Sequence, residues 1–418
     1  MADLKAWDRS YEWKAVTLLG LGFGLVGLDR WIIAPLFPFM MKDLHLSYQD
    51  LGNLIGILGI CWGIFAAVMG SVSDKIGRRK VLIPAIILFS ILSGLSGLAT
   101  SLMSLVIIRA IMGVMEGSFC PTSFAATNEA SDPKRRGFNQ GMQQCTFALF
   151  GLGFGPIIAT QLLAVVPNWR WVFFIAAIPG LILGALMYWT IRDIAPLKGN
   201  SAAVAIHPWA KIFHSRNIVL SMVGLLCAMT GVFVISAMVP NYLVDYLHLT
   251  PTQMGFVTSA IGFGGFLGQI AVPGFSDILG RKVMAIASFV GAALLIRIFI
   301  ATGANPAALF GLLFVISFFC LGVIGLITGP ISTESAPVGL VSSAIGIVVG
   351  SGEVFGGGIA PSVAGYVAQH YGIQNILYLA LWGVILGIVV CLFLKETAPR
   401  KARRHAEQSL ETEVAALH

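Results

Sequence analysis

Ionisable side chains occur inside long apolar stretches of this sequence, where they could bind or carry charge. Asp29 and Arg30 are adjacent in the apolar run Gly24–Phe37, and Arg109 and Glu116 stand seven residues apart in another run. An ionisable group at the centre of a bilayer costs about 2.5–3.5 kcal/mol on insertion scales, so it is normally paired, solvated or functional. These four residues are therefore the first candidates for a functional site.

The spacing of the four residues predicts a compact charge cluster. Seven residues make two helical turns, so Arg109 and Glu116 should lie on one helix face, about 10 Å apart along the axis. Neighbours on a helix point about 100° apart, so Asp29 and Arg30 need different partners. We expect Asp29 to pair with Arg109, and Arg30 to meet Glu116 at the floor or wall of a substrate cavity.

The apolar runs that carry these residues are predicted to be membrane helices. Hydrophobic residues make up 57% of the 418 residues and charged residues only 11%, which is too little charge to cover a soluble protein of this size. Many runs approach the ~20 residues that span the hydrocarbon core of a bilayer. The sequence predicts an all-α integral membrane protein with about twelve transmembrane helices, at 15–40, 51–70, 81–99, 104–127, 137–164, 171–191, 217–243, 254–275, 283–302, 307–330, 340–368 and 374–394.

The distribution of basic residues predicts the orientation of these helices. Segments on the side of the N-terminus hold 21 of the 26 Lys and Arg residues, and the opposite loops hold only two. Cytoplasmic loops carry an excess of Lys and Arg, so both termini should lie in the cytoplasm. The net charge of +7 is then this bias and not a nucleic-acid footprint. Together with the absence of any N-x-Ser/Thr sequon, it favours a multi-pass protein of a cell inner membrane.

The sequence contains an internal repeat with an offset of 203 residues. The stretch SDKIGRRKV at Ser73–Val81 recurs as SDILGRKV at Ser276–Val283. Two tandem halves of six helices are typical of transporters that rock around a central site. We expect an N-terminal six-helix bundle at 1–191, a cytoplasmic central loop at 192–216, a C-terminal six-helix bundle at 217–394 and a cytoplasmic tail at 395–418.

Three motifs carry a family resemblance over nearly the whole chain. They are GSVSDKIGRRKV between the second and third helices, RAIMG at Arg109–Gly113 and GLGFGP at Gly151–Pro156. This combination resembles the major facilitator superfamily, which implies two pseudo-symmetric six-helix bundles. Glycine in the first motif lets two helix ends approach closely, and Asp74 is expected near a helix N-terminus or paired with a basic residue of the other half. The resemblance implies a cytoplasmic gate at Asp74, Gly77, Arg78, Arg79, Asp277 and Arg281.

The charge cluster sharpens the resemblance. An Asp-Arg pair on the first helix, with Arg109 and Glu116-Gly117 on the fourth, is similar to the anion:cation symporter family. The resemblance implies that Asp29 and Glu116 carry protons while Arg30 and Arg109 neutralise carboxylates. The chemistry agrees, because a guanidinium binds a carboxylate through two hydrogen bonds and a carboxyl group in a partly dry cavity can take up a proton near neutral pH. Protonation of Glu116 would release Arg30 to bind the substrate.

Other polar residues within the predicted helices are also candidates for the site, and several roles fit them. Glu353 in GSGEVFGGG has no acidic counterpart in the first half, and three roles stay open: a second proton site, a substrate contact, or a hydrogen bond to backbone exposed by the glycines. Tyr242 and Ser351 are candidate substrate contacts. Gln143 either lines the cavity or forms hydrogen bonds between helices.

The predicted function is therefore proton-coupled uptake of a small organic anion, such as a sugar acid or another carboxylate, by alternating access. Two alternatives within transport are an aromatic-acid/proton symporter and a proton-coupled drug exporter, since GLGFGP resembles the fifth-helix motif of such antiporters. A membrane sensor that binds a ligand without moving it is a further alternative.

The same residues exclude other classes of function. No nucleophile-base constellation and no Walker lysine motif occur, so neither an enzyme nor ATP hydrolysis is expected. The six cysteines form no CxxC pair and the seven histidines have no metal-ligand spacing, so no cofactor or metal is expected. The expected partners are the organic anion, protons and lipid, and the expected state is a monomer, although the sequence does not fix the oligomeric state.

Overall fold

The structure is a computed structural model that describes residues 8–192, 208–337 and 340–398. Within these ranges the secondary structure is helical, and twelve helical segments are long and apolar enough to cross a membrane. The predicted all-α fold and its twelve spans are thus confirmed. Most of the predicted central loop and tail, 193–207 and 399–418, lies outside the described residues.

The first six spans come from the first half of the chain. They are α1 (Arg9–Trp31) with α2 (Ile33–Leu44), α3 (Tyr48–Ile76), α4 (Arg78–Ser96), α5 (Leu102–Ala130), α6 (Arg136–Thr146) with the π-helix η1 (Phe147–Phe154) and α7 (Gly155–Val165), and α8 (Trp169–Thr190). Proline inside α2, α5 and α8 removes a backbone donor, but the helices continue.

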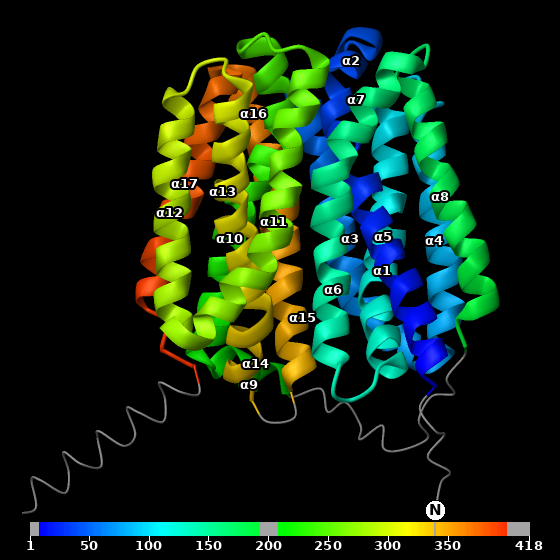
Figure 1. Ribbon diagram of the computed structural model, residues 1–418, viewed down its shortest axis with the longest axis vertical. Coiled ribbons are helices and arrows are strands. Elements are labelled where there is room, and N and C mark those ends of the chain that lie inside the picture. Colours follow the sequence, from blue (N-terminus) through cyan, green and yellow to red (C-terminus); the bar gives the residue numbers. More distant parts are fainter. Residues whose placement is uncertain (1–7, 193–207, 338–339, 399–418) are drawn as a thin grey trace, which may run out of the picture.

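The other six spans follow the short helix α9 (Pro208–His214). They are α10 (Arg216–Asn241) with the π-helix η2 (Tyr242–Tyr246), α11 (Pro251–Leu279), α12 (Arg281–Ala301), α13 (Pro306–Leu326) with η3 (Ile327–Ile331) and α14 (Ser332–Ser335), α15 (Val341–Gly352) with η4 (Glu353–Ile359) and α16 (Ala360–Tyr371), and η5 (Ile373–Asn375) with α17 (Ile376–Leu392). Helices before the central loop lie on one side of the molecule and those after it on the other (Figure 1).

The 203-residue repeat extends to the backbone. Ser47 caps α3 through a reciprocal hydrogen-bonded box with Asp50, and Thr250 caps α11 in the same way with Gln253. Gly77 and Gly280, also 203 residues apart, both have a φ of 102°, which a side chain would strain. The two halves therefore share helix starts and stops as well as sequence letters.

Glycines allow close contact between the halves along α3. A Cβ on Gly52, Gly56, Gly59 or Gly63 would meet atoms of α15, η4 or α16. Close backbone approach through small residues is how membrane helices gain packing energy. Gly70 is the next glycine on this face. A Cβ added there would meet only the side chain of Pro121 of α5, at 3.7 Å, which is an ordinary contact distance. The α3 seam, which we define by Gly52, Gly56, Gly59 and Gly63, is thus closed on the side away from the termini and ends before Gly70.

Candidate functional site

Arg30 and Glu353 form an ion pair between the two halves. Arg30 lies one residue before the end of α1, and Glu353 is the first residue of η4. Nη2 of Arg30 donates to Oε2 of Glu353 at 2.9 Å, and their side chains are 1% and 9% exposed. Among the described residues, this ion pair places the positive charge of the first half against an acid of the second.

Arg109 is held by the backbone at the end of α1. Its Nη1 donates to the carbonyl oxygens of Asp29 at 3.1 Å and Arg30 at 3.2 Å. The carbonyl end of a helix is the negative end of its dipole and favours a cation. The Asp29 carboxylate instead accepts a hydrogen bond from Ser93 Oγ of α4 at 2.8 Å. The expected side-chain pairing of Asp29 with Arg109 is therefore wrong.

Glu116 is the acid without a direct partner. It is fully buried on α5, and neither carboxyl oxygen has a hydrogen-bond partner. It interacts electrostatically with Asp29, Arg30, Arg109 and Glu353. The expected contact of Arg30 with Glu116 is replaced by the Arg30–Glu353 pair. The five charges nevertheless form the cluster that the sequence predicts for four of them, and we call this set the central charge cluster.

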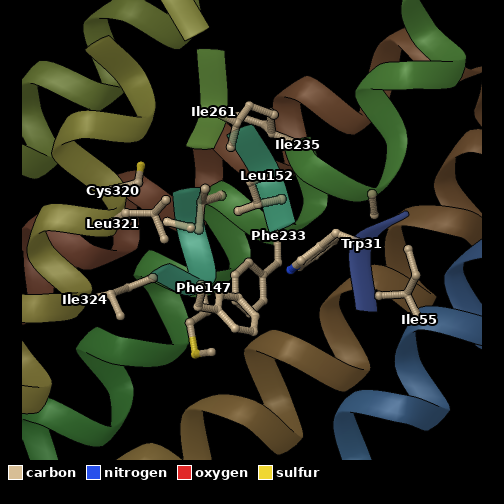
Figure 2. Packing of buried hydrophobic residues seen from close by; sticks show 14 of the residues in the cluster. Trp31, Ile55, Phe147, Leu152, Phe233, Ile235, Ile261, Cys320, Leu321 and Ile324 are labelled. Atoms are coloured by element: carbon tan, nitrogen blue, oxygen red, sulfur yellow. The ribbon is translucent and has the colours of Figure 1, made fainter. Parts of the chain in front are cut away.

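Aromatic rings surround the guanidinium of Arg30. Its Cζ lies 5.6 Å from the centre of the Trp31 ring, 5.9 Å from that of Trp62 and 5.2 Å from that of Phe233. Figure 2 shows the Trp31 indole directed toward Phe233, and the two rings meet edge to face at 5.0 Å. Sequence reasoning placed neither Trp62 nor Phe233 in the site. The available signal was the repeat, because Phe233 stands 203 residues after Arg30.

Three predicted substrate contacts lie outside the central charge cluster. Tyr242 stacks on Tyr246 at 5.2 Å and lies 6.2 Å from Phe299 of α12. Gln143 is buried between α5 and α6, where its amide bonds to Thr127 and Ser123. Ser351 donates to the carbonyl of Val348 in its own helix.

The predicted gate residues form two equivalent clusters, one in each half. Arg78 pairs with Asp74 and Glu129, and Arg281 pairs with Asp277 and Glu334. Each arginine also donates to a serine hydroxyl, Ser73 or Ser276, at 2.6 Å.

All of these pairs lie within one half, so the expected contact of Asp74 across the interface does not occur in this structure. Arg79 donates to the carbonyl of Tyr188 on α8. Glu129 and Glu334 were not predicted as partners, although both stand near the ends of equivalent helices.

A buried acid near the N-terminus was also missed. Glu12 of α1 is 1% exposed and accepts hydrogen bonds from Arg135 at 2.6 Å and Asn139 at 2.9 Å. It also accepts from the backbone N–H of Asp132 at 3.2 Å. These contacts tie α1 to the loop between α5 and α6. Nothing in the sequence indicated this buried acid, because the charged residues around it are typical of a solvent-exposed stretch.

Comparisons with known proteins agree with this architecture. The profile of the Major Facilitator Superfamily matches residues 19–230 and 221–417. The chain is 26% identical to a probable 4-methylmuconolactone transporter of Cupriavidus pinatubonensis, over 81% of each chain. It is 26% identical to a hexuronate transporter of Bacillus subtilis, over 91% of this chain and 94% of that one.

A solved structure shares the fold. The inward-facing, unoccupied form of a bacterial homologue of the human lysosomal transporter Spinster superposes with a TM-score of 0.71. The two chains are 16% identical, and the match covers 92% of this chain and 97% of that one. At this identity the likeness concerns the fold alone.

Proposed function

Since the chain belongs to the Major Facilitator Superfamily and is a secondary transporter, we propose that it takes up a small organic anion together with protons. The relatives named above include transporters of a lactone and of hexuronate, which supports a carboxylate-like cargo. The bias of Lys and Arg supports an inner-membrane location with both termini in the cytoplasm. We propose the two halves at 1–191 and 217–394 as the moving bundles.

One observation carries the proposal: a buried arginine that binds a carboxylate of the other half. In the structure, Arg30 Nη2 donates to Glu353, while Arg30 Nε and Nη1 have no hydrogen-bond partner among the described residues. A buried charge stripped of its partner is costly, so Arg30 requires an anion at all times. A cargo carboxylate can replace Glu353 at this position, because a guanidinium forms two parallel hydrogen bonds with such a group.

Protons enter through the acids of the central charge cluster. When cargo takes Arg30, the displaced carboxylate of Glu353 loses its partner, and a proton neutralises it at lower cost than burying the free charge. Glu116 is already unpaired and buried, so it is the second proposed proton carrier, and Asp29 is the third. Arg109 supports the substrate charge from the end of α1. The coupling of anion and proton then follows from shared electrostatics.

The gate clusters are proposed to control access to the site from the cytoplasm during the transport cycle. We propose that Asp74, Gly77, Arg78 and Arg79 in the first half, and Asp277 and Arg281 in the second, hold the cytoplasmic ends of the helices. Their ion pairs lie within single halves here, where the α3 seam is closed at the opposite end. Closure of the cytoplasmic side would bring these clusters together and open the α3 seam.

The test is uptake into proteoliposomes that hold the pure protein. Labelled organic acids are offered with and without an inward proton gradient, to the wild type and to Glu116→Gln. The expected result is gradient-driven accumulation by the wild type, with the variant retaining exchange but losing accumulation. Asp43→Asn serves as the matched control, because Asp43 pairs with Arg170 on the surface. Failure of every organic acid to move under any gradient contradicts the proposal, and cationic drugs are then tried.

A further inference from the structure

The polar atoms that remain unpaired around Arg30 are mostly hydrogen-bond donors. Within the described residues, the buried atoms without partners include Nε and Nη1 of Arg30, Nε and Nη2 of Arg109, and the indole Nε1 of Trp31 and Trp62. An indole N–H only donates, and a guanidinium has no acceptor. The acids in electrostatic contact with this group are Asp29, Glu116 and Glu353.

Few side-chain hydrogen-bond acceptors lie near these donors, and most of them already accept a hydrogen bond. Asp29 accepts from Ser93, and Glu353 accepts from Arg30. Farther from the cluster, Ser123 of α5 accepts a hydrogen bond from the side-chain amide of Gln143 on α6. Glu116 is then the acid whose oxygens are free, and in the proposed mechanism it takes up a proton.

The side chains beside these donors are flat, apolar rings. Trp31, Trp62 and Phe233 present their rings within 6 Å of the Arg30 guanidinium, and they are 2%, 4% and 3% exposed. A Cβ at Gly357 would meet Nη2 of Arg30 at 2.9 Å, so η4 comes close to the ion pair from the other side. Aromatic faces favour planar partners that stack or meet edge to face.

We propose that the cargo is a flat carboxylate with many acceptors and few donors, such as an unsaturated dicarboxylate, a lactone acid or an aromatic acid. This inference rests on the proposed function and narrows its substrate class. The carboxylate binds Arg30, a second acceptor binds the indole N–H of Trp31 or Trp62, and the plane of the cargo lies among the rings.

A sugar acid fits this arrangement poorly. Each hydroxyl of a sugar acid is a donor that loses its hydrogen bond to water when it is buried, and leaving it unpaired is unfavourable. The apolar rings offer such hydroxyls no acceptor. A site built around donors and apolar rings therefore disfavours an analogue that brings more donors, by about a hundredfold for an added hydroxyl.

The test uses three dicarboxylates with the same six-carbon chain and charge: cis,cis-muconate, which is flat, adipate, which is saturated, and galactarate, which carries hydroxyls. Benzoate and cyclohexanecarboxylate form a second pair, one planar and one puckered. Proton-driven uptake is measured for each in proteoliposomes. We expect the flat member to have the higher kcat/KM in each set, with galactarate lower than muconate by on the order of a hundredfold.

Variants assign the preference to the rings and the indole donors. Trp62→Phe keeps a ring and deletes the N–H, so KM for muconate should rise about five- to tenfold. Phe233→Leu keeps the donors and should reduce the preference for muconate over adipate. Trp382→Phe is the matched control, because Trp382 lies on the outer surface of α17 with 66% exposure, and it should change neither value.

The outcomes separate the two proposals. Proton-driven uptake that is fastest for galactarate, or a preference that Trp62→Phe and Phe233→Leu leave intact, overturns the flat-cargo inference and leaves anion symport standing. If none of the five acids moves while another labelled organic acid does, the flat-cargo inference alone fails. If no organic acid moves under a proton gradient, the proposed function fails and this inference fails with it.

Discussion

Arg30 and Glu353 connect the two halves of the protein across 323 residues of sequence, with Nη2 of Arg30 2.9 Å from Oε2 of Glu353. The pair lies where α1 ends and where η4 begins. π-Helical turns occur frequently at functional sites. The structure thus joins its buried cation and a buried acid at irregular points of two helices.

The ion pair should show strong non-additivity. Removing one partner from a buried pair leaves an uncompensated charge, which typically costs about 3–5 kcal/mol, whereas replacing both by apolar residues is often neutral. Glu353→Leu should therefore lower stability far more than Arg30→Met/Glu353→Leu. Thermal unfolding of both variants in one detergent measures this difference. Equal losses in the single and double variants would show that the two side chains are not energetically coupled.

The face of α3 that carries the α3 seam should tolerate side chains only beyond the end of the seam. Alanine has a better helix propensity than glycine by about 1 kcal/mol, so a loss on Gly→Ala substitution must come from the contact. A Cβ on Gly59 would run into the backbone of Gly357 and Gly358, and a Cβ on Gly70 would not. We expect Gly59→Ala to lower uptake at least about tenfold and Gly70→Ala to leave it within about twofold. Similar uptake by both variants would contradict the observed packing.

The two gate clusters should differ in strength. Arg281 binds both carboxylate oxygens of Glu334, at 3.2 and 2.8 Å, whereas Arg78 reaches only one oxygen of Glu129. Two parallel bonds are stronger than two bonds to one atom. Glu334→Gln should therefore destabilise the protein more than Glu129→Gln, by about 1 kcal/mol. Chemical or thermal unfolding compares them, and the reverse order would refute the assignment.

Glu12 should matter for stability despite its position at the start of α1. Loss of its charge removes a hydrogen bond to Arg135 and weakens the bond from Asn139. Hydrogen bonds to charged groups are worth about 1.5–3 kcal/mol, so Glu12→Gln should lower stability by that amount. Asp43→Asn breaks a surface pair with Arg170 and should cost about 0–1 kcal/mol. If Glu12→Gln and Asp43→Asn unfolded at the same temperature, Glu12 would contribute no more to stability than a surface charge does.

Hydropathy and repeats predicted the helices well, because burial in lipid demands long apolar segments with internal hydrogen bonds. Four of the five members of the central charge cluster were also predicted to lie together, since charges within such segments are rare. Their pairing was not. Arg30 pairs with Glu353 and not with Glu116. This pairing depends on where the fold places η4 relative to α1, which the spacing of residues along one helix does not encode.

For other residues, the polarity of the neighbouring sequence did not reveal which contacts they make in the fold. Glu12 was overlooked among charged neighbours, although the fold buries it against Asn139. Tyr242 was predicted as a substrate contact, and the structure packs its ring on Tyr246 and Phe299, outside the central charge cluster. The contact of Glu12 with Asn139 and that of Tyr242 with Phe299 each join helices that are far apart in sequence.

The contact of Arg30 with Phe233 has a consequence for the symmetry of the two halves. The two positions are equivalent in the 203-residue repeat, and the fold brings them together, with 5.2 Å between the guanidinium carbon and the ring centre. If both positions carried arginine, two like charges would confront each other in a medium of low dielectric. Repulsion between two such charges favours a charged side chain at only one of the two positions. Of the two equivalent positions at this contact between the halves, one therefore carries the charge and the other an uncharged ring.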